Sequence, residues 1–203
     1  MKKIKTLLVL VLIVAAVLSF SSCSKSRMLN EMAVVQAISF DDKDGIVTVG
    51  IQYLDLNKGS GINEGLGSSL TSNAVGRGKT STDAVANLAD TLPDNMYTGQ
   101  AKLIIVGDSF YKNRMPELKN DLLRNPNLRC DLLIARSENA LDVLKNGFRN
   151  ERVPIDGACK ELRSAKALVR VNDYLSNNSV RLPVIVNIKG DDKKVGDSAY
   201  VVY

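Results

Sequence analysis

The chain has 203 residues and a mass of 22.1 kDa, which suits one domain, or one domain with a small second one. It contains no histidine, which excludes histidine-based catalytic dyads and triads and removes the commonest metal ligand. Basic residues number 27 against 22 acidic ones, but without residues 1–22 the balance is 24 against 22. Nucleic-acid binding needs a concentrated basic face, so we exclude nucleic acid as a partner.

The N-terminus has the pattern of an export signal. Three lysines precede an apolar run over residues 7–18, and small residues then lead to Cys23. The run is shorter than the roughly 20 residues that span a bilayer. A cysteine in this position resembles a bacterial lipobox, so we expect residues 1–22 to be a lipoprotein signal peptide and residues 23–30 a lipidated tether. Cys23 would carry S-diacylglycerol and be open to N-acylation; ordinary cleavage and an uncleaved anchor are the alternatives.

This signal predicts that the rest of the chain is lipid-anchored on the outer face of the cytoplasmic membrane. Cys130 and Cys159 would then lie in a non-cytosolic space, where disulfides form. Both also lie in apolar stretches, and buried free cysteines are common. The sequence therefore leaves open whether these two cysteines pair.

The first elements along the chain predict a β-hairpin followed by a loop. Residues 33–40 are apolar with a β-branched centre, residues 41–45 are turn-forming, and residues 46–53 partly alternate. Residues 57–79 are rich in glycine, serine and asparagine, which indicates a long mobile loop.

Helices and strands alternate after the loop. Apolar spacing predicts four helices: from a cap at residues 80–82 to Leu92, from Met115 to Leu122, from a cap at Ser137 to Phe148, and over residues 158–176. Apolar runs predict strands over residues 102–107, 128–135, 183–188 and 199–203. This order predicts an α+β fold, in which helices pack against a mixed β-sheet. We expect a single extracytoplasmic domain over residues 31–203.

Two short motifs resemble ligand-binding loops and fail in detail. Residues 76–80 match the end of a phosphate-binding P-loop, but its first glycine would fall on Asn73. We interpret them as a loop that enters a helix cap. The acidic residues 41–45 suggest a calcium loop, but Phe40 and Ile51 would occupy its first and last ligand positions, so we interpret an acidic hairpin turn. No spacing identifies a catalytic, cofactor or metal site, and we expect a protein that is not an enzyme.

The stretch from Cys23 to Asp41 resembles the mature start of the Ger(x)C spore germination lipoproteins, C-W-D-x-R-E-L-x-x-L-A-x-V-x-G-I-x-x-D. The positions on this pattern are Cys23, Arg27, Leu29, Ala33, Val35, Ile38 and Asp41. The departures are Ser24, Lys25, Met28 and Ala37. Three further segments match the family in order, namely residues 78–80 before a helix, Tyr97 with residues 102–107, and residues 122–129.

This resemblance implies a non-catalytic lipoprotein subunit of a nutrient germinant receptor, docked to the integral membrane A and B subunits. Cys23 would hold it to membrane lipid on the outer face of the spore inner membrane, and residues 57–79 are a candidate contact. Typical members are longer, so residues 31–203 would be the N-terminal domain without the C-terminal domains. The alternatives are an extracytoplasmic solute-binding lipoprotein, which an aromatic content of 5% disfavours, and a surface enzyme, which the lack of histidine disfavours.

Overall fold

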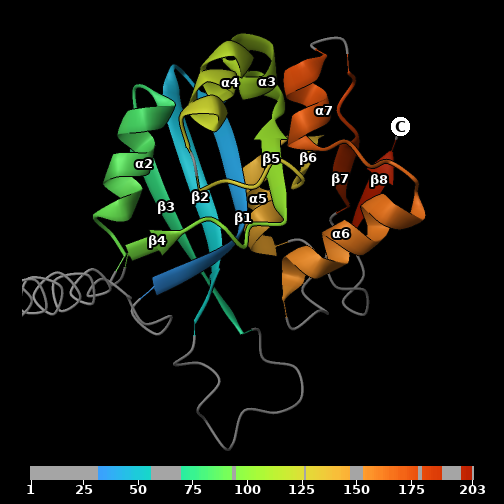
Figure 1. Ribbon diagram of the computed structural model, residues 1–203, viewed down its shortest axis with the longest axis horizontal. Coiled ribbons are helices and arrows are strands. Elements are labelled where there is room, and N and C mark those ends of the chain that lie inside the picture. The colour runs from blue at the N-terminus through green and yellow to red at the C-terminus, as the bar shows by residue number, and fades with distance from the viewer. Residues whose placement is uncertain are drawn as a thin grey trace, which may run out of the picture. The chain divides into compact units, whose positions relative to one another are not determined.

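The described part of the chain forms a mixed β-sheet with helices on both faces (Figure 1). The computed structural model describes residues 32–55, 70–92, 95–125, 127–146, 153–177, 180–188 and 198–202. The predicted signal peptide, the tether and Cys23 lie outside these residues. Within them, none of the helices combines the length and apolar character needed to cross a bilayer.

The sheet has the strand order β3-β2-β1-β5-β6-β7-β8, and β4 pairs with β1 beside this path. The strands are β1 (Met32–Lys43), β2 (Ile46–Leu54), β3 (Thr71–Gly78), β4 (Asn95–Tyr97), β5 (Leu103–Gly107), β6 (Leu133–Ser137), β7 (Val184–Ile188) and β8 (Ser198–Val202). β1 is antiparallel to β2 but parallel to β4 and β5. The α+β class and the mixed sheet predicted from the sequence are therefore confirmed.

The β1–β2 hairpin has the turn that its sequence favours. Asp44 and Gly45 have φ angles of 53° and 78°, which place both residues in the left-handed region. Asp-Gly is a preferred pair for a two-residue hairpin turn of this hand, because its backbone twist matches that of the strands. The predicted hairpin and its acidic turn are confirmed.

β1 has a β-bulge at Gln36, where its pairing with β2 is interrupted and its backbone bonds the segment before β5. The register with β2 shifts between Val35 and Ala37. The carbonyl of Gln36 instead accepts a hydrogen bond from the Lys102 N–H, at 2.8 Å. Val35 and Ile38 consequently face the same core, three residues apart, where regular alternation would place them on opposite faces.

The helices form one layer on each face of the sheet. They are α2 (Ser81–Ala89), α3 (Asp108–Asn113), α4 (Met115–Arg124), α5 (Ala140–Asn146), α6 (Pro154–Ser164) and α7 (Val171–Ser176). α2, α3, α4 and α7 supply side chains to one core, and α5 and α6 to the other. Fully buried side chains such as Phe110 and Leu118 in the first core and Leu162 in the second each contribute about 1.5–3 kcal/mol.

The loop predicted over residues 57–79 is wrong for its last part, because residues 71–78 form β3. The glycines of this strand led to the loop prediction. They are needed because α2 packs closely on β3. A Cβ on Gly76 would lie 2.1 Å from the Ala84 carbonyl oxygen of α2, so α2 can approach β3 only where side chains are missing. Residues 57–69 lie outside the described residues.

The other differences concern short elements and boundaries. The sequence analysis did not predict β4 or α3, which have three and six residues. The strand predicted over residues 128–135 is β6, which begins five residues later. The helix predicted over residues 158–176 is two helices, α6 and α7. Lys166, with a φ of 55°, and the bridge of Arg170 to Leu133 interrupt it.

Ser137 does not cap a helix, as the sequence predicted. It is the last residue of β6, and α5 begins at Ala140. The side chain of Asn139 accepts a hydrogen bond from the Asp142 N–H at 2.9 Å, which is the contact typical of a helix cap.

Candidate functional site

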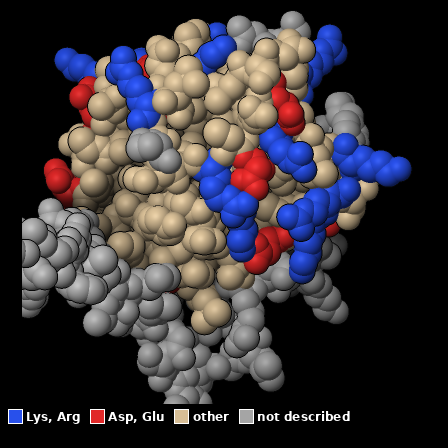
Figure 2. Space-filling model, viewed as in Figure 1, with Lys and Arg blue, Asp and Glu red and all other residues tan. Residues whose placement is uncertain are grey.

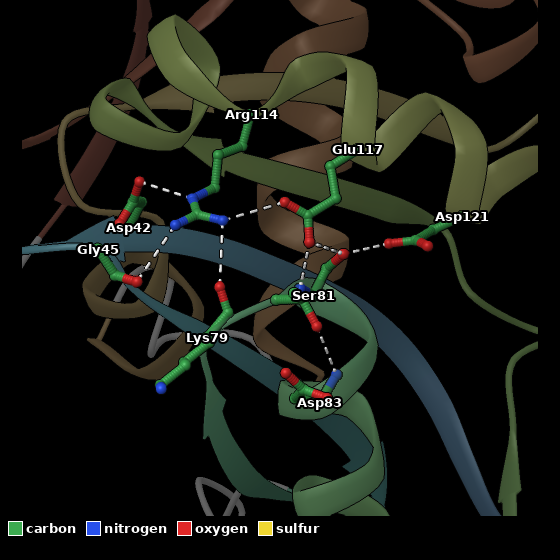
Figure 3. A network of polar contacts seen from close by, with 9 residues as sticks. Asp42, Gly45, Lys79, Ser81, Asp83, Arg114, Glu117 and Asp121 are labelled. Atoms are coloured by element: carbon green, nitrogen blue, oxygen red, sulfur yellow. Dashed lines mark hydrogen bonds and ion pairs between the residues drawn. The ribbon is translucent and has the colours of Figure 1, made fainter.

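Arg114 joins three separate parts of the fold (Figure 3). Its Nε donates to Asp42 Oδ2 at 2.9 Å, at the end of β1. Nη1 donates to Glu117 Oε2 and to the Lys79 carbonyl, both at 3.2 Å, and Nη2 donates to the Gly45 carbonyl at 3.2 Å. One guanidinium thus connects the β1–β2 turn, the entry to α2 and the start of α4. The hydrogen bonds to Asp42 and Glu117 raise the pKa of Arg114 further.

The start of α2 is held to α4 by Ser81, whose N–H donates to Glu117 Oε1 at 2.5 Å. The Ser81 hydroxyl lies between Glu117 Oε1, at 2.8 Å, and Asp121 Oδ2, and its single proton serves one of them at a time. Burial acts to raise the pKa of Glu117, but the hydrogen bonds from Ser81 and Arg114 outweigh it and lower that pKa below 4.5.

Asp41 performs a similar role on the opposite face of the sheet. Its Oδ1 and Oδ2 accept hydrogen bonds from the N–H groups of Ala140 and Leu141, at 3.0 and 2.6 Å. Burial raises the pKa of Asp41 despite these two bonds. The acidic residues that suggested a calcium loop therefore hold α4 and α5 to the end of β1. No group of three or more cysteine, aspartate or glutamate residues in the described ranges is placed to hold a metal ion.

The residues that resembled a P-loop are structural as well. Gly76 and Gly78 lie in β3 beneath α2, and their backbone faces helix atoms instead of a cavity. Thr80 is the N-cap of α2, and its Oγ1 accepts a hydrogen bond from the Asp83 N–H at 3.1 Å. The predicted helix cap is confirmed, although a strand precedes it instead of a loop.

An apolar pocket of about 400 Å³ lies between α2, α4 and the sheet. Its floor consists of side chains from β1, β2 and β5, namely Ile38, Phe40, Val49, Ile51 and Ile104. Asp121 and Arg124 of α4 contribute the charged groups of its lining. Figure 2 shows a broad uncharged area on this face of the molecule. The lining of the pocket is suited to binding an apolar molecule or side chain, and it offers few polar groups for catalysis.

A second hollow, which we call the charged cleft, has a volume of about 340 Å³. Its charged lining residues are Lys102, Arg129, Asp131, Arg163 and Arg170, and Figure 2 shows charged side chains gathered on the right of the view. Arg129 donates to Asp131 at 2.9 Å and holds the pKa of that exposed carboxyl below its usual value. Lys102 pairs with Asp156 at 2.7 Å.

The two cysteines of the domain are free thiols, so the disulfide that the sequence left open is not formed. Cys159 lines the charged cleft but is only 5% exposed. Burial, with a smaller effect of Asp156, raises the pKa of Cys159 to about 11. The thiol is therefore protonated at neutral pH and is a poor nucleophile. Cys130 is exposed, between two residues that line the same cleft.

The two thiols are expected to differ in reactivity. With the folded chain at pH 8, in a Cys23→Ser background that leaves two cysteines, a thiol reagent should modify Cys130 within minutes and Cys159 only after unfolding, because burial limits both access and ionisation. Titration of thiols with and without urea measures this difference. The Cys130→Ser variant should show no reactive thiol before unfolding; a fast-reacting thiol in that variant would contradict the buried position of Cys159.

Both hollows are assembled from segments far apart in the sequence, and the sequence analysis identified neither. Its one predicted site, lipidation at Cys23, lies outside the described residues. The cations of the charged cleft occur singly at residues 102, 129, 163 and 170, so no local pattern marks them. The apolar pocket is lined by residues that sequence periodicity assigns simply to the core.

Comparison with known proteins identifies one family. A family model described as the spore germination protein N-terminal domain matches residues 25–167, a stretch that begins two residues after Cys23 and ends after α6. Neither the curated proteins nor the solved structures include a match. The matched stretch is well over half of the chain and contains β1 to β6. The chain therefore belongs to the Ger(x)C spore germination family, whose N-terminal domain it carries.

Proposed function

We propose that this protein is a non-catalytic, lipid-anchored subunit of a spore nutrient germinant receptor. The observation that carries the proposal is the family match over residues 25–167, directly after a cysteine in a lipobox-like context. Membership of a spore germination family supports a role in germination. The anchor and the receptor partners are inferred from Cys23 and from the resemblance of residues 23–41.

In this proposal the acyl chains on Cys23 hold the protein on the outer face of the spore inner membrane. Each buried CH₂ group contributes about 0.8 kcal/mol, so two or more chains give stable anchoring. The folded domain then docks to the integral A and B subunits. The links made by Arg114 and Asp41 favour a domain that docks as a rigid body, because they fix helices on both faces to the same end of β1.

The test is affinity purification of the tagged full chain from detergent-solubilised spore inner membrane. We expect two polytopic partners to co-purify, and mass spectrometry to find acyl groups on Cys23. The Cys23→Ala variant should lose both the acyl groups and stable membrane retention. Cys130→Ala is the matched control, since it removes an exposed cysteine elsewhere and should change neither. An acylated chain that purifies without partners would contradict the receptor role and leave the anchor intact.

The apolar pocket favours a second candidate, a solute-binding lipoprotein. Its volume of about 400 Å³ is within the range of small-molecule sites, and its lining is mostly aliphatic. Native mass spectrometry of the purified chain distinguishes the two functions. A retained small apolar molecule would favour solute binding, whereas co-purified membrane subunits favour the receptor subunit.

A further inference from the structure

We propose that the charged cleft docks onto anionic phospholipid headgroups and so sets the orientation of the domain on the membrane. This inference rests on the proposed anchoring at Cys23 and deepens it. The anchor alone would leave the domain free to rotate on its tether. The cleft supplies the second contact, which selects one edge of the sheet to face the bilayer.

The first argument is charge. Lys102, Arg129, Arg163 and Arg170 line one hollow, and Asp131 is the acidic residue that lines it. The carboxylates of Asp131 and Asp156 neutralise Arg129 and Lys102. Among the residues that the structure describes, neither Arg163 nor Arg170 forms an ion pair. Arg170 interacts with Asp131 only through a weaker coulombic effect than that of Arg129. Guanidinium groups bind phosphate oxygens through two parallel hydrogen bonds, so these two arginines are the candidate phosphate ligands.

The second argument is the apolar surface beside these cations. Leu168 lines the cleft and is 43% exposed, two residues before Arg170. Leu132 and Leu133 are buried in the same lining. In the headgroup region of a bilayer, apolar side chains reach the boundary of the acyl chains while cations bind the phosphates. An exposed leucine next to arginines can make both contacts.

The third argument is position. Lys102 directly precedes β5, and Leu133 begins β6, so the cleft lies where the parallel strands start. β1 also starts at this edge, because it is parallel to β5 and its Gln36 bonds Lys102. Met32 lies nine positions after Cys23, and a chain of that length spans at most about 30 Å. The described domain thus begins, at Met32, at the end of the sheet where the parallel strands start.

The chain itself offers a probe and a matched control. Cys130 is exposed at the cleft, whereas Cys159 is buried, so a fluorophore can be attached to Cys130 in the full acylated chain. Arg77 and Lys112 are exposed cations near the opposite ends of the strands, on β3 and in α3 after β5. Removing them changes the net charge as much as removing two cleft arginines.

The experiment places the acylated, labelled full chain on vesicles of phosphatidylcholine, with or without phosphatidylglycerol. Flotation reports anchoring, and quenching by lipids with a nitroxide headgroup reports the distance of Cys130 from the membrane. We expect quenching with phosphatidylglycerol that is largely lost without it, and also in 1 M salt, where the Debye length is about 3 Å. Each cation near an anionic surface raises the ratio of docked to undocked protein roughly fivefold. The double variant Arg163→Ala with Arg170→Ala should therefore lower this ratio roughly 25-fold.

The outcomes separate the two proposals. Arg77→Ala with Lys112→Ala should leave the quenching unchanged. A chain that floats with the vesicles but shows no dependence on phosphatidylglycerol, or equal losses in both double variants, overturns the docking and leaves the anchoring intact. An acylated chain that fails to float on either vesicle contradicts the anchoring, and the docking inference is rejected with it.

Discussion

Replacing Arg114 with alanine is expected to lower the free energy of unfolding by about 3 kcal/mol. The substitution leaves the Asp42 side chain, which is only 8% exposed, without its cation. It also removes the donors to the carbonyl groups of Gly45 and Lys79, which hold the hairpin turn and the entry to α2. Urea unfolding at pH 7, followed by circular dichroism, measures the change.

Two variants and one change of pH test the cause. Adding Asp42→Asn to Arg114→Ala removes the uncompensated charge and should recover part of the loss. The folded pKa of Glu117 lies below 4.5, so its contribution to stability is present above that pH and is lost as the pH falls through the lowered value. Acidification should therefore destabilise the wild type more than Arg114→Ala. If the difference in free energy of unfolding between the wild type and Arg114→Ala stays constant down to pH 3, charge pairing is not the cause.

Replacing Gly76 with alanine is expected to cost about 3 kcal/mol, although it adds one methyl group. The new Cβ would lie 2.1 Å from the Ala84 carbonyl oxygen and 2.5 Å from the backbone nitrogen of Leu88. Both are backbone atoms of α2, so the clash cannot be relieved by turning a side chain. The helix must move away from β3 and disturb the apolar pocket beneath it.

The matched control for this substitution is Gly45→Asn in the hairpin turn. A Cβ at Gly45 has no neighbour within 4 Å, and asparagine tolerates the positive φ of this position. We expect less than about 1 kcal/mol from that change. Urea unfolding compares the two variants, and soluble yield serves as a second measure where Gly76→Ala does not fold. Equal stability of the two variants would show that α2 is not held tightly against β3.

Local patterns predicted the elements that local forces determine. The hairpin follows from apolar residues on both sides of Asp44-Gly45, and the start of α2 follows from the hydroxyl of Thr80. β3 could not be predicted in this way. Its glycines are required because α2 packs directly on them. The sequence of β3 by itself contains no sign of that contact. The break between α6 and α7 likewise depends on the bridge from Arg170 to Leu133, which is a tertiary contact.

The sites were harder to predict than the fold, for the same reason. Arg114 meets Asp42 across 72 positions of sequence, and Lys102 meets Asp156 across 54. Each of these residues looks like an ordinary surface charge in its own segment. Two sequence features pointed beyond the fold, namely the export signal that ends at Cys23 and the family resemblance, which rests on residues matched in order along the chain.

The central place of β1 in the sheet has a mechanical consequence. β1 has β2 along one side and β4 and β5 along the other, and the chain enters the domain through its first residue, Met32. A force applied to Met32 along the axis of β1 loads the hydrogen bonds to both neighbours together, in shear. An edge strand pulled away sideways would lose its bonds one at a time. β1, with neighbours on both sides, therefore resists a pull along its axis better than an edge strand resists a sideways pull.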